Sequence, residues 1–280
     1  MFSIKELEIF RAVAESGGIT KAAARLHRVQ SNVTTRVKQL EARLGKTLFH
    51  RAQRRLVLSE DGKLLLEYAE RLLRLSAEAE SALHAGAPRG TFRLGALEST
   101  AAARLPALLG RYHRDYPDVR LELVTGTTGS LVHRVLAGEL EAAFVAEPFT
   151  SAGLETRHAF TETLVLISPR DFKLSERPHV PILAFAAGCS YRRRLEAWLA
   201  TQRIAPERVM EYGSYHAMVA CVAAGGGIAL VPRSVLSLMK AQAEIRLRSL
   251  PAETALAKTH LVWRAGHRSS ALAALDSLVA

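Results

Sequence analysis

The 280-residue sequence is poor in cysteine: Cys189 and Cys221 are its only two, so a disulfide framework does not hold the fold together. It also lacks a long apolar run. Residues 218–232 are uncharged, but they are too few and too rich in glycine to span a bilayer, which takes about 20 apolar residues. The first ten residues carry three charged side chains where a secretory signal needs an apolar segment. We therefore expect a cytoplasmic protein without a membrane partner.

Acidic residues are almost missing from residues 16–59, where Glu41 stands against ten lysines and arginines. This segment has a net charge of +9, whereas the whole chain has +11. Because the cations interrupt a patterned, foldable segment, their concentration indicates a surface that binds a polyanion. We predict that the polyanion is double-stranded DNA.

The apolar spacing of the same region predicts three helices. The first begins near Ile4 and ends at Gly17–Gly18, a short second helix covers TKAAARL, and the third runs from Gln30 to Leu44. One side of the third helix is apolar, and the opposite side carries short hydrogen-bonding side chains and a lysine. A helix of this kind can enter the major groove and read base edges with its N-terminal residues.

Two short apolar strands, residues 48–49 and 56–58, flank a basic turn at residues 50–55. A basic hairpin beside a reading helix is typical of a wing that lies along the phosphate backbone. The side chains predicted to face bases are Gln30, Ser31, Thr34 and Thr35, with Asn32 beside them, and those predicted to bind phosphates are Arg28, Lys38, Arg51, Arg54 and Arg55.

Residues 60–86 read as one helix, with acids in its first turn and neither proline nor glycine between Gly62 and Gly86. Two apolar series recur at intervals of seven, which predicts a two-stranded coiled coil between two copies of the chain. They are Leu65, Leu72 and Ala79, and Tyr68, Leu75 and Ala82. The glycines and proline that follow indicate a hinge.

The span SGGITKAAARLHRVQSNVTTRVKQLEARLGKTLFHRAQRRLVLSEDG resembles the winged helix-turn-helix of LysR-type transcriptional regulators, and the match runs through residues 2–62. The resemblance implies that residues 60–86 dimerise the protein, as a homodimer or a homotetramer, and that RNA polymerase is a further candidate partner. One departure stands out. The family usually opens the reading helix with Ser-Gln-Pro, whereas residues 29–32 are Val-Gln-Ser-Asn, and this predicts that the N-cap moves to Ser31 or Asn32.

From Thr91 onward, apolar strands alternate with helices, which predicts parallel sheets covered by helices. The order is similar to the two-lobed effector domain of the same family, built like a type II periplasmic binding protein. The expected fold is thus α/β with a helical winged helix-turn-helix head. Its parts are the DNA-binding domain 1–59, linker helix 60–86, hinge 87–90 and effector-binding domain 91–280, with lobe I at 91–163 and 265–280 and lobe II at 164–264.

Ligands of open parallel sheets bind beyond the carboxyl ends of the strands. Many residues at these strand ends carry hydroxyl groups and begin helices, and a helix N-terminus stabilises a small anion. Two glutamates at the strand ends would instead favour an ammonium group. An ordinary helix cap remains the alternative for any single serine or threonine. The predicted effector-binding residues are Glu98, Ser99, Thr100, Thr127, Thr128, Glu147, Ser190, Tyr191, Arg192, Ser214 and Tyr215.

The segments GALEST, CSYRRRLEAW and SYHAMVACVAAGGGIALVPRS are similar to a PtrR-like branch of the family that is linked to putrescine utilisation. This resemblance implies a small polar effector from polyamine, amino-acid or semialdehyde metabolism. It leaves the identity of the effector open.

Motifs of catalysis are missing. The chain has no G-x-S-x-G, no H-E-x-x-H and no paired C-x-x-C, and Gly225–Gly227 follows a helix where a dinucleotide loop would follow a strand. We therefore expect no enzyme activity, no metal and no cofactor apart from the effector. The alternatives are an enzyme joined to a DNA-binding head, and a redox-responsive regulator that uses Cys189 and Cys221.

Overall fold

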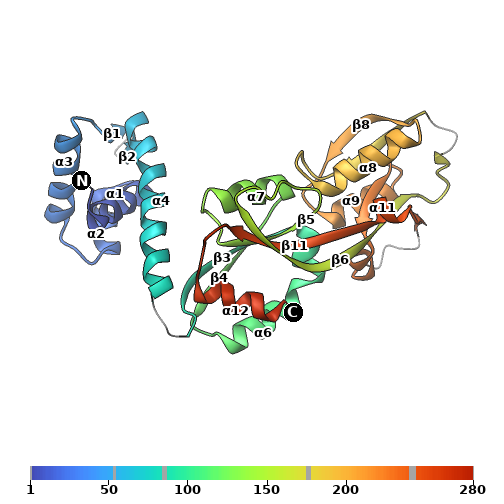
Figure 1. Cartoon of the computed structure of the whole chain (residues 1–280). Coiled ribbons are helices and arrows are strands. Elements are labelled where there is room, and N and C mark those ends of the chain that lie inside the picture. Colours follow the sequence, from blue (N-terminus) through green and yellow to red (C-terminus); the bar gives the residue numbers. More distant parts are fainter. Residues whose placement is uncertain (1, 53–54, 84–86, 175–177, 240–243, 280) are drawn as a thin grey trace. The chain divides into compact units, whose positions relative to one another are not determined.

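The computed structural model describes residues 2–52, 55–83, 87–174, 178–239 and 244–279. The chain forms two units, residues 1–85 and 86–280 (Figure 1). Each has its own buried core, and they are described separately below.

The first unit contains the three expected helices, a hairpin and a long fourth helix. Its elements are α1 (Ile4–Ser16), α2 (Ile19–Arg25), α3 (Gln30–Leu44), β1 (Phe49–Ala52), β2 (Arg55–Leu58) and α4 (Glu60–Leu83). The apolar stripe of α3, formed by Val33, Val37 and Leu40, packs with Leu7 and Phe10 of α1 in one core. This core holds the opposite face of α3 toward solvent.

Two local predictions about this unit are wrong. The N-cap of α3 is Val29, not Ser31 or Asn32, because the extended backbone of Val29 (φ −75°, ψ 142°) lets its carbonyl accept from the N–H groups of Asn32 and Val33. The strands of the wing are also longer than expected. Phe49 pairs with Leu58 and Ala52 with Arg55, so residues 50–52 belong to β1 and not to the turn.

The helix α4 covers the core of the first unit with one side and leaves the other bare. Leu65, Ala69 and Leu73 are buried against α1, which means that Leu65 belongs to this core and not to an exposed coiled-coil seam. Tyr68, Leu72 and Leu75 remain 52%, 40% and 56% exposed. The large exposed apolar residues of α4 are therefore Leu64, Tyr68, Leu72 and Leu75, without Leu65.

The second unit is built on a seven-stranded sheet of order β10-β6-β11-β5-β3-β4, with β9 also paired to β6. The strands are β3 (Gly90–Ala96), β4 (Val119–Thr125), β5 (Ala142–Ala146), β6 (Leu154–Pro169), β9 (Ala229–Pro232), β10 (Ile245–Arg248) and β11 (Leu256–Arg264). A parallel pair is formed by β7 (His179–Ala184) and β8 (Ala205–Glu211), and an isolated bridge joins Ile182 of β7 to Ile228, the residue before β9. The helices are α5 (Glu98–Ala103), α6 (Leu105–Asp115), α7 (Thr128–Leu136), α8 (Ser190–Thr201), α9 (Tyr215–Ala223), α10 (Arg233–Ser237), α11 (Ala252–Ala255) and α12 (Ser270–Leu278).

Parallel pairing is confirmed for β3 with β4 and β5, and for β7 with β8, but β6, β9, β10 and β11 pair antiparallel. The reason is that β6 leaves the first lobe and β11 returns to it, so the two run in opposite directions across both lobes (Figure 1). The return was expected near residues 264–266. It occurs at Leu256, where β11 begins to pair with β6.

The helices α5 and α6 are separate and meet at Arg104. Pro106 lies in the first turn of α6, where its missing N–H costs nothing, whereas inside a continuous helix it would break a hydrogen bond.

The acid sensitivity of the first unit should depend on Glu6. The N–H of Ser3 and the guanidinium of Arg43 donate to its carboxylate and lower its pKa from 4.5 to about 2. Because the pKa of Glu6 is lower in the folded state than in the unfolded state, its ionised carboxylate stabilises the fold above pH 4.5. This stabilisation is lost as the pH falls toward 2 and the carboxylate becomes protonated. The stability difference between the native protein and Glu6→Gln, followed by urea unfolding monitored by circular dichroism, should therefore shrink over that range. The variant Glu8→Gln removes the same charge from an exposed acid on α1 and controls for the loss of charge. If the difference for Glu6→Gln does not shrink toward pH 2, the assignment is wrong.

Candidate functional sites

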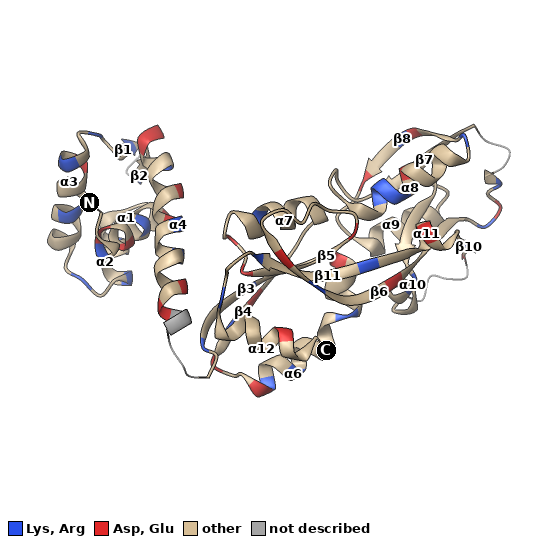
Figure 2. Ribbon diagram, in the orientation of Figure 1, with Lys and Arg blue, Asp and Glu red and all other residues tan. Residues whose placement is uncertain are grey.

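The outward face of α3 carries the residues predicted to face bases. Gln30, Ser31, Asn32 and Thr35 are exposed, as is Lys38 one turn further on. Thr34 is half-buried, and its hydroxyl donates to the carbonyl of Gln30 at 2.9 Å. This hydroxyl therefore cannot donate a hydrogen bond to a base at the same time. Figure 2 shows lysines and arginines along α3 and on the β1–β2 hairpin.

The basic residues of the first unit have two different roles. Arg25 bonds to Glu15, and Arg43 bonds to both carboxylate oxygens of Glu6, so these two guanidiniums hold helices together. Four of the residues predicted to bind phosphates are exposed and make no ion pair within the described part of the chain: Arg28, Lys38, Arg51 and Arg55. Arg54 lies outside the described residues.

A shallow hollow on α3 includes three residues that the sequence analysis did not select. Val29, Arg36 and Gln39 line it together with Ser31, Asn32 and Thr35. Their spacing along α3 is the signal that could have identified them, because residues three and four apart share a helix face.

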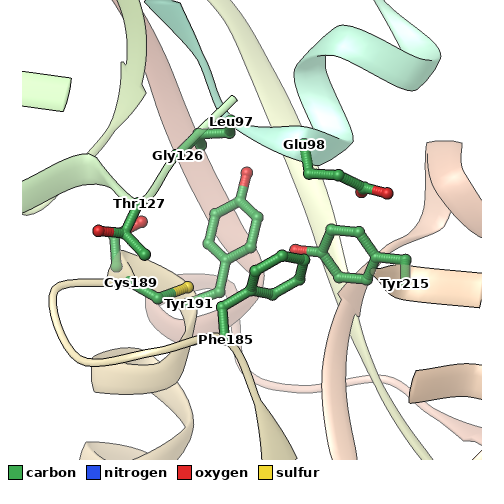
Figure 3. Close-up of a pocket in the computed structure, with 9 residues that line it drawn as sticks. Leu97, Glu98, Gly126, Thr127, Phe185, Cys189, Tyr191 and Tyr215 are labelled. Carbon is green, nitrogen blue, oxygen red and sulfur yellow. The ribbon is translucent and has the colours of Figure 1, made fainter. Parts of the chain in front are cut away.

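A small cavity lies between the two lobes of the second unit (Figure 3). The first lobe contributes Leu97, Glu98, Gly126 and Thr127. The second contributes Phe185, Cys189, Ser190, Tyr191 and Tyr215. Five predicted effector-binding residues thus line one cavity, and the sequence analysis missed its apolar wall. The strand ends after β3, β4 and β7 could have suggested Leu97, Gly126 and Phe185.

The remaining predicted effector-binding residues do not line this cavity. Glu147 bonds to His260 Nε2 at 2.8 Å, and Arg192 bonds to Glu196 and Glu211 on lobe II. The Thr128 hydroxyl donates to the Ala146 carbonyl at 3.2 Å. Ser214 precedes α9 without lining the cavity, and Ser99 and Thr100 are buried behind its wall.

Five buried hydroxyl groups lack a hydrogen-bond partner within the described residues. Those of Ser190 and Tyr191 belong to residues that line this cavity, and those of Ser99, Thr100 and Thr259 belong to residues outside its lining. The Tyr191 hydroxyl faces Ser99 and Thr259 but completes a bond of good geometry with neither. Unpaired buried polar groups are costly, so a cluster of them can supply donors and acceptors to a bound polar molecule.

Glu98 is the one carboxylate in the lining of this cavity. Burial raises its pKa, and the N–H of Tyr215 at the start of α9 partly opposes that shift. Its Oε2 is buried without a partner among the described residues, and Figure 3 shows the carboxylate beside Tyr215. A cation in the cavity would favour the charged form of Glu98.

Burial also raises the pKa of the Cys189 thiol and so disfavours the reactive thiolate. Both Cys189 and Cys221 are free. The redox interpretation therefore gains no support from the environment of Cys189.

The lobes touch each other around the cavity. The N–H of Gly129 donates to the carbonyl of Gly188 at 3.1 Å, and Arg194 Nε on lobe II donates to the carbonyl of Glu147 at 3.2 Å. Only about 10 Å³ is free inside the cavity, room for about one water molecule. A metabolite would therefore need the lobes or the side chains to move apart.

A buried carboxylate holds the lobes where the chain crosses between them. Glu162 of β6 is 2% exposed, bonds to Arg104 at the end of α5 and accepts from the Ser234 hydroxyl of α10 at 2.8 Å. Arg104 also lies over the Phe160 ring, 5.5 Å from its centroid. Glu162 thus links lobe I, the crossing strand and lobe II.

Within the described residues, no group of three His, Cys, Asp or Glu side chains is placed to hold a metal ion. None of the described helices is long and apolar enough to cross a membrane.

Two family models match the chain. The bacterial regulatory helix-turn-helix protein model of the lysR family matches residues 4–63, and the LysR substrate binding domain model matches residues 85–279. The chain is 43% identical to the uncharacterized HTH-type transcriptional regulator YusT of Bacillus subtilis over 92% of this chain and 88% of that protein. It is 36% identical to the HTH-type transcriptional regulator GltR of the same organism, over 94% and 90%.

Solved structures share the fold over almost the whole chain. CbnR, a LysR family transcriptional regulator, superposes with a TM-score of 0.69 at 25% identity, covering 99% of this chain and 98% of that one. Full-length CbnR in complex with its target DNA gives 0.70 at 24% identity, covering 99% of each chain.

Proposed function

The chain belongs to the LysR family of DNA-binding transcriptional regulators, and from this premise we propose which residues read DNA, which surface joins two copies and which chemistry the effector has. Its relatives are transcriptional regulators and not enzymes. The main support is that the basic residues of the first unit fall into two groups. Arg25 and Arg43 pair with acids of α1. Arg28, Lys38, Arg51 and Arg55 are exposed and make no ion pair among the described residues.

We place α3 in the major groove. Gln30, Ser31, Asn32 and Thr35 face bases, and Thr34 contributes less because its hydroxyl already bonds to Gln30. Arg28 and Lys38 hold phosphates beside α3, while Arg51 and Arg55, together with Arg54, hold phosphates along the wing. Residues 1–59 are then the DNA-binding domain.

Replacing Arg51 and Arg55 together by alanine should weaken binding to every duplex alike, because phosphate contacts carry no sequence information. The slope of log Kd against log salt concentration should fall by about 2, close to one unit for each lost contact. Fluorescence anisotropy with specific and random duplexes at several salt concentrations measures both effects. The double variant Arg111→Ala/Arg208→Ala removes the same charge from the second unit and should leave the slope unchanged. A loss confined to one base position would contradict the phosphate assignment.

The exposed stripe of α4 is the proposed contact between two copies. Tyr68, Leu72, Leu75 and Ala79 follow one another at alternating steps of four and three, the spacing of a coiled-coil seam, and all four are exposed. Two copies also place two reading helices on one operator. The linker helix is then 60–86, with a hinge at 87–90, and the same contact can serve a dimer or a tetramer.

Leu72→Glu should put a charge into this seam and give monomers that bind an operator poorly. The control Ala77→Glu adds the same charge to α4 away from the stripe and should keep the native assembly. Sedimentation velocity distinguishes the two. If Leu72→Glu sediments as the native protein does, the subunits associate through another surface.

The effector we propose is a small metabolite with an ammonium group and a short apolar body, and a carboxylate is compatible with it. Glu98 supplies the acceptor for the ammonium group, the orphaned hydroxyls bind further polar atoms, and Phe185, Tyr191 and Tyr215 enclose the apolar part. Polyamines, amino acids and their semialdehydes fit this description, in keeping with a role in their catabolism. Binding would shift the population of lobe arrangements and so alter how the dimer contacts DNA and RNA polymerase.

A thermal-shift screen of the intact protein against amino acids, polyamines, semialdehydes and small dicarboxylates tests this chemistry. A ligand at one hundred times its Kd should stabilise the second unit by about 2.7 kcal/mol. Glu98→Gln should abolish the shift, whereas Glu147→Gln, which alters a carboxylate outside the cavity lining, should retain it. A hit that needs Glu147 and not Glu98 would move the ammonium site away from the cavity.

A further inference from the structure

A second cavity lies at the edge of lobe II, where β10 is the outer strand on β6. Its free volume is about 100 Å³, roughly ten times that of the interlobe cavity. Leu166 and Ser168 of β6, Leu174, Ile228 and two arginines of β10 contribute to its walls. None of these residues lines the interlobe cavity.

The strand register places both arginines on one face. Arg246 pairs with Ser168 and Arg248 with Leu166, and directly opposite residues of an antiparallel pair share a face. Residues two apart on a strand are separated by only about 7 Å. Two exposed guanidiniums are thus held side by side at the rim of the cavity.

Among the residues that the structure describes, no acidic side chain pairs with either arginine. Neither Arg246 nor Arg248 makes an ion pair or a side-chain hydrogen bond within the part of the chain that the structure describes. The Ser168 hydroxyl beneath Arg246 donates to the Pro169 carbonyl at 3.1 Å and keeps acceptor capacity only. Charge of this sign, without a counter-charge, favours an anion at the rim.

The floor of the cavity is apolar. Leu166, Leu174 and Ile228 are 3%, 7% and 0% exposed, so their side chains face inward and not toward solvent. An apolar floor suits an aliphatic group, and the free volume of about 100 Å³ limits that group to a short chain.

We propose that this cavity is a second ligand site, which binds a monoanion with a short apolar body, such as an aliphatic carboxylate of about four to six carbons. The carboxylate lies between Arg246 and Arg248, which can each donate two parallel hydrogen bonds, and the aliphatic chain lies on Leu166, Leu174 and Ile228. The ligand would bridge β10 to the end of β6, the strand that continues into lobe I.

Isothermal titration calorimetry of the intact protein with hexanoate tests the site. Hexanamide, which has the same body without the charge, and inorganic phosphate, which has charge without the body, should both bind at least about tenfold more weakly. Arg246→Gln and Arg248→Gln should each raise the Kd for hexanoate about tenfold or more. Arg208→Gln, an exposed and unpaired arginine on β8, is the matched control and should leave this Kd unchanged.

Two results would overturn the proposal. Hexanoate binding that survives Arg246→Gln and Arg248→Gln but is lost in Glu98→Gln would place the carboxylate in the interlobe cavity. Equal affinity for hexanoate and phosphate would show an unspecific cationic surface without an apolar subsite. Both arginines are exposed, so their replacement should leave the melting temperature unchanged, and this separates loss of binding from loss of fold.

Discussion

The pairing of β6 with β11 is the constraint on which the second unit depends. β6 is one strand of sixteen residues; its first part pairs with β11, and its last part pairs with β9 and β10. Backbone hydrogen bonds join β6 to β11 on both sides of an irregularity in register between Thr259 and His260, and this pairing connects the two lobes. Glu162 sits in this ladder with Arg104 on one side and Ser234 on the other, and its burial without those partners would be costly.

The interlobe cavity is a consequence of this arrangement. Strands β3, β4 and β7 end at its edge, so the first turns of the following helices bring hydroxyl groups, Glu98 and the tyrosines to the same place. The N–H of Gly129 donates to the carbonyl of Gly188 and joins the two lobes beside this cavity, whose free volume is about 10 Å³. Leu166 and Ser168, at the far end of the crossing strand β6, line the second cavity.

In the first unit, the acids decide which cations remain for DNA. Glu6 and Glu15 bond to Arg43 and Arg25, and Glu41 accepts from the N–H groups of Leu48 and Phe49 at the start of the wing. A net charge alone cannot distinguish these structural cations from the unpaired ones, because both kinds count equally in the sequence. Only the three-dimensional partners separate them.

The sequence by itself determined the family, the order of elements and the position of α3. Helix periodicity, glycines at helix ends and charge are properties of the local sequence, and tertiary packing did not override them. It also located Glu98, Thr127, Ser190, Tyr191 and Tyr215, since strand ends are visible in the pattern. The tertiary structure decided the antiparallel crossing of β6 and β11, the burial of Leu65 and the N-cap at Val29. It also assigned Glu147 to His260 and Arg192 to Glu196 and Glu211. These depend on which distant groups meet, and a single side chain can bond only to the partner that the folded chain brings within reach.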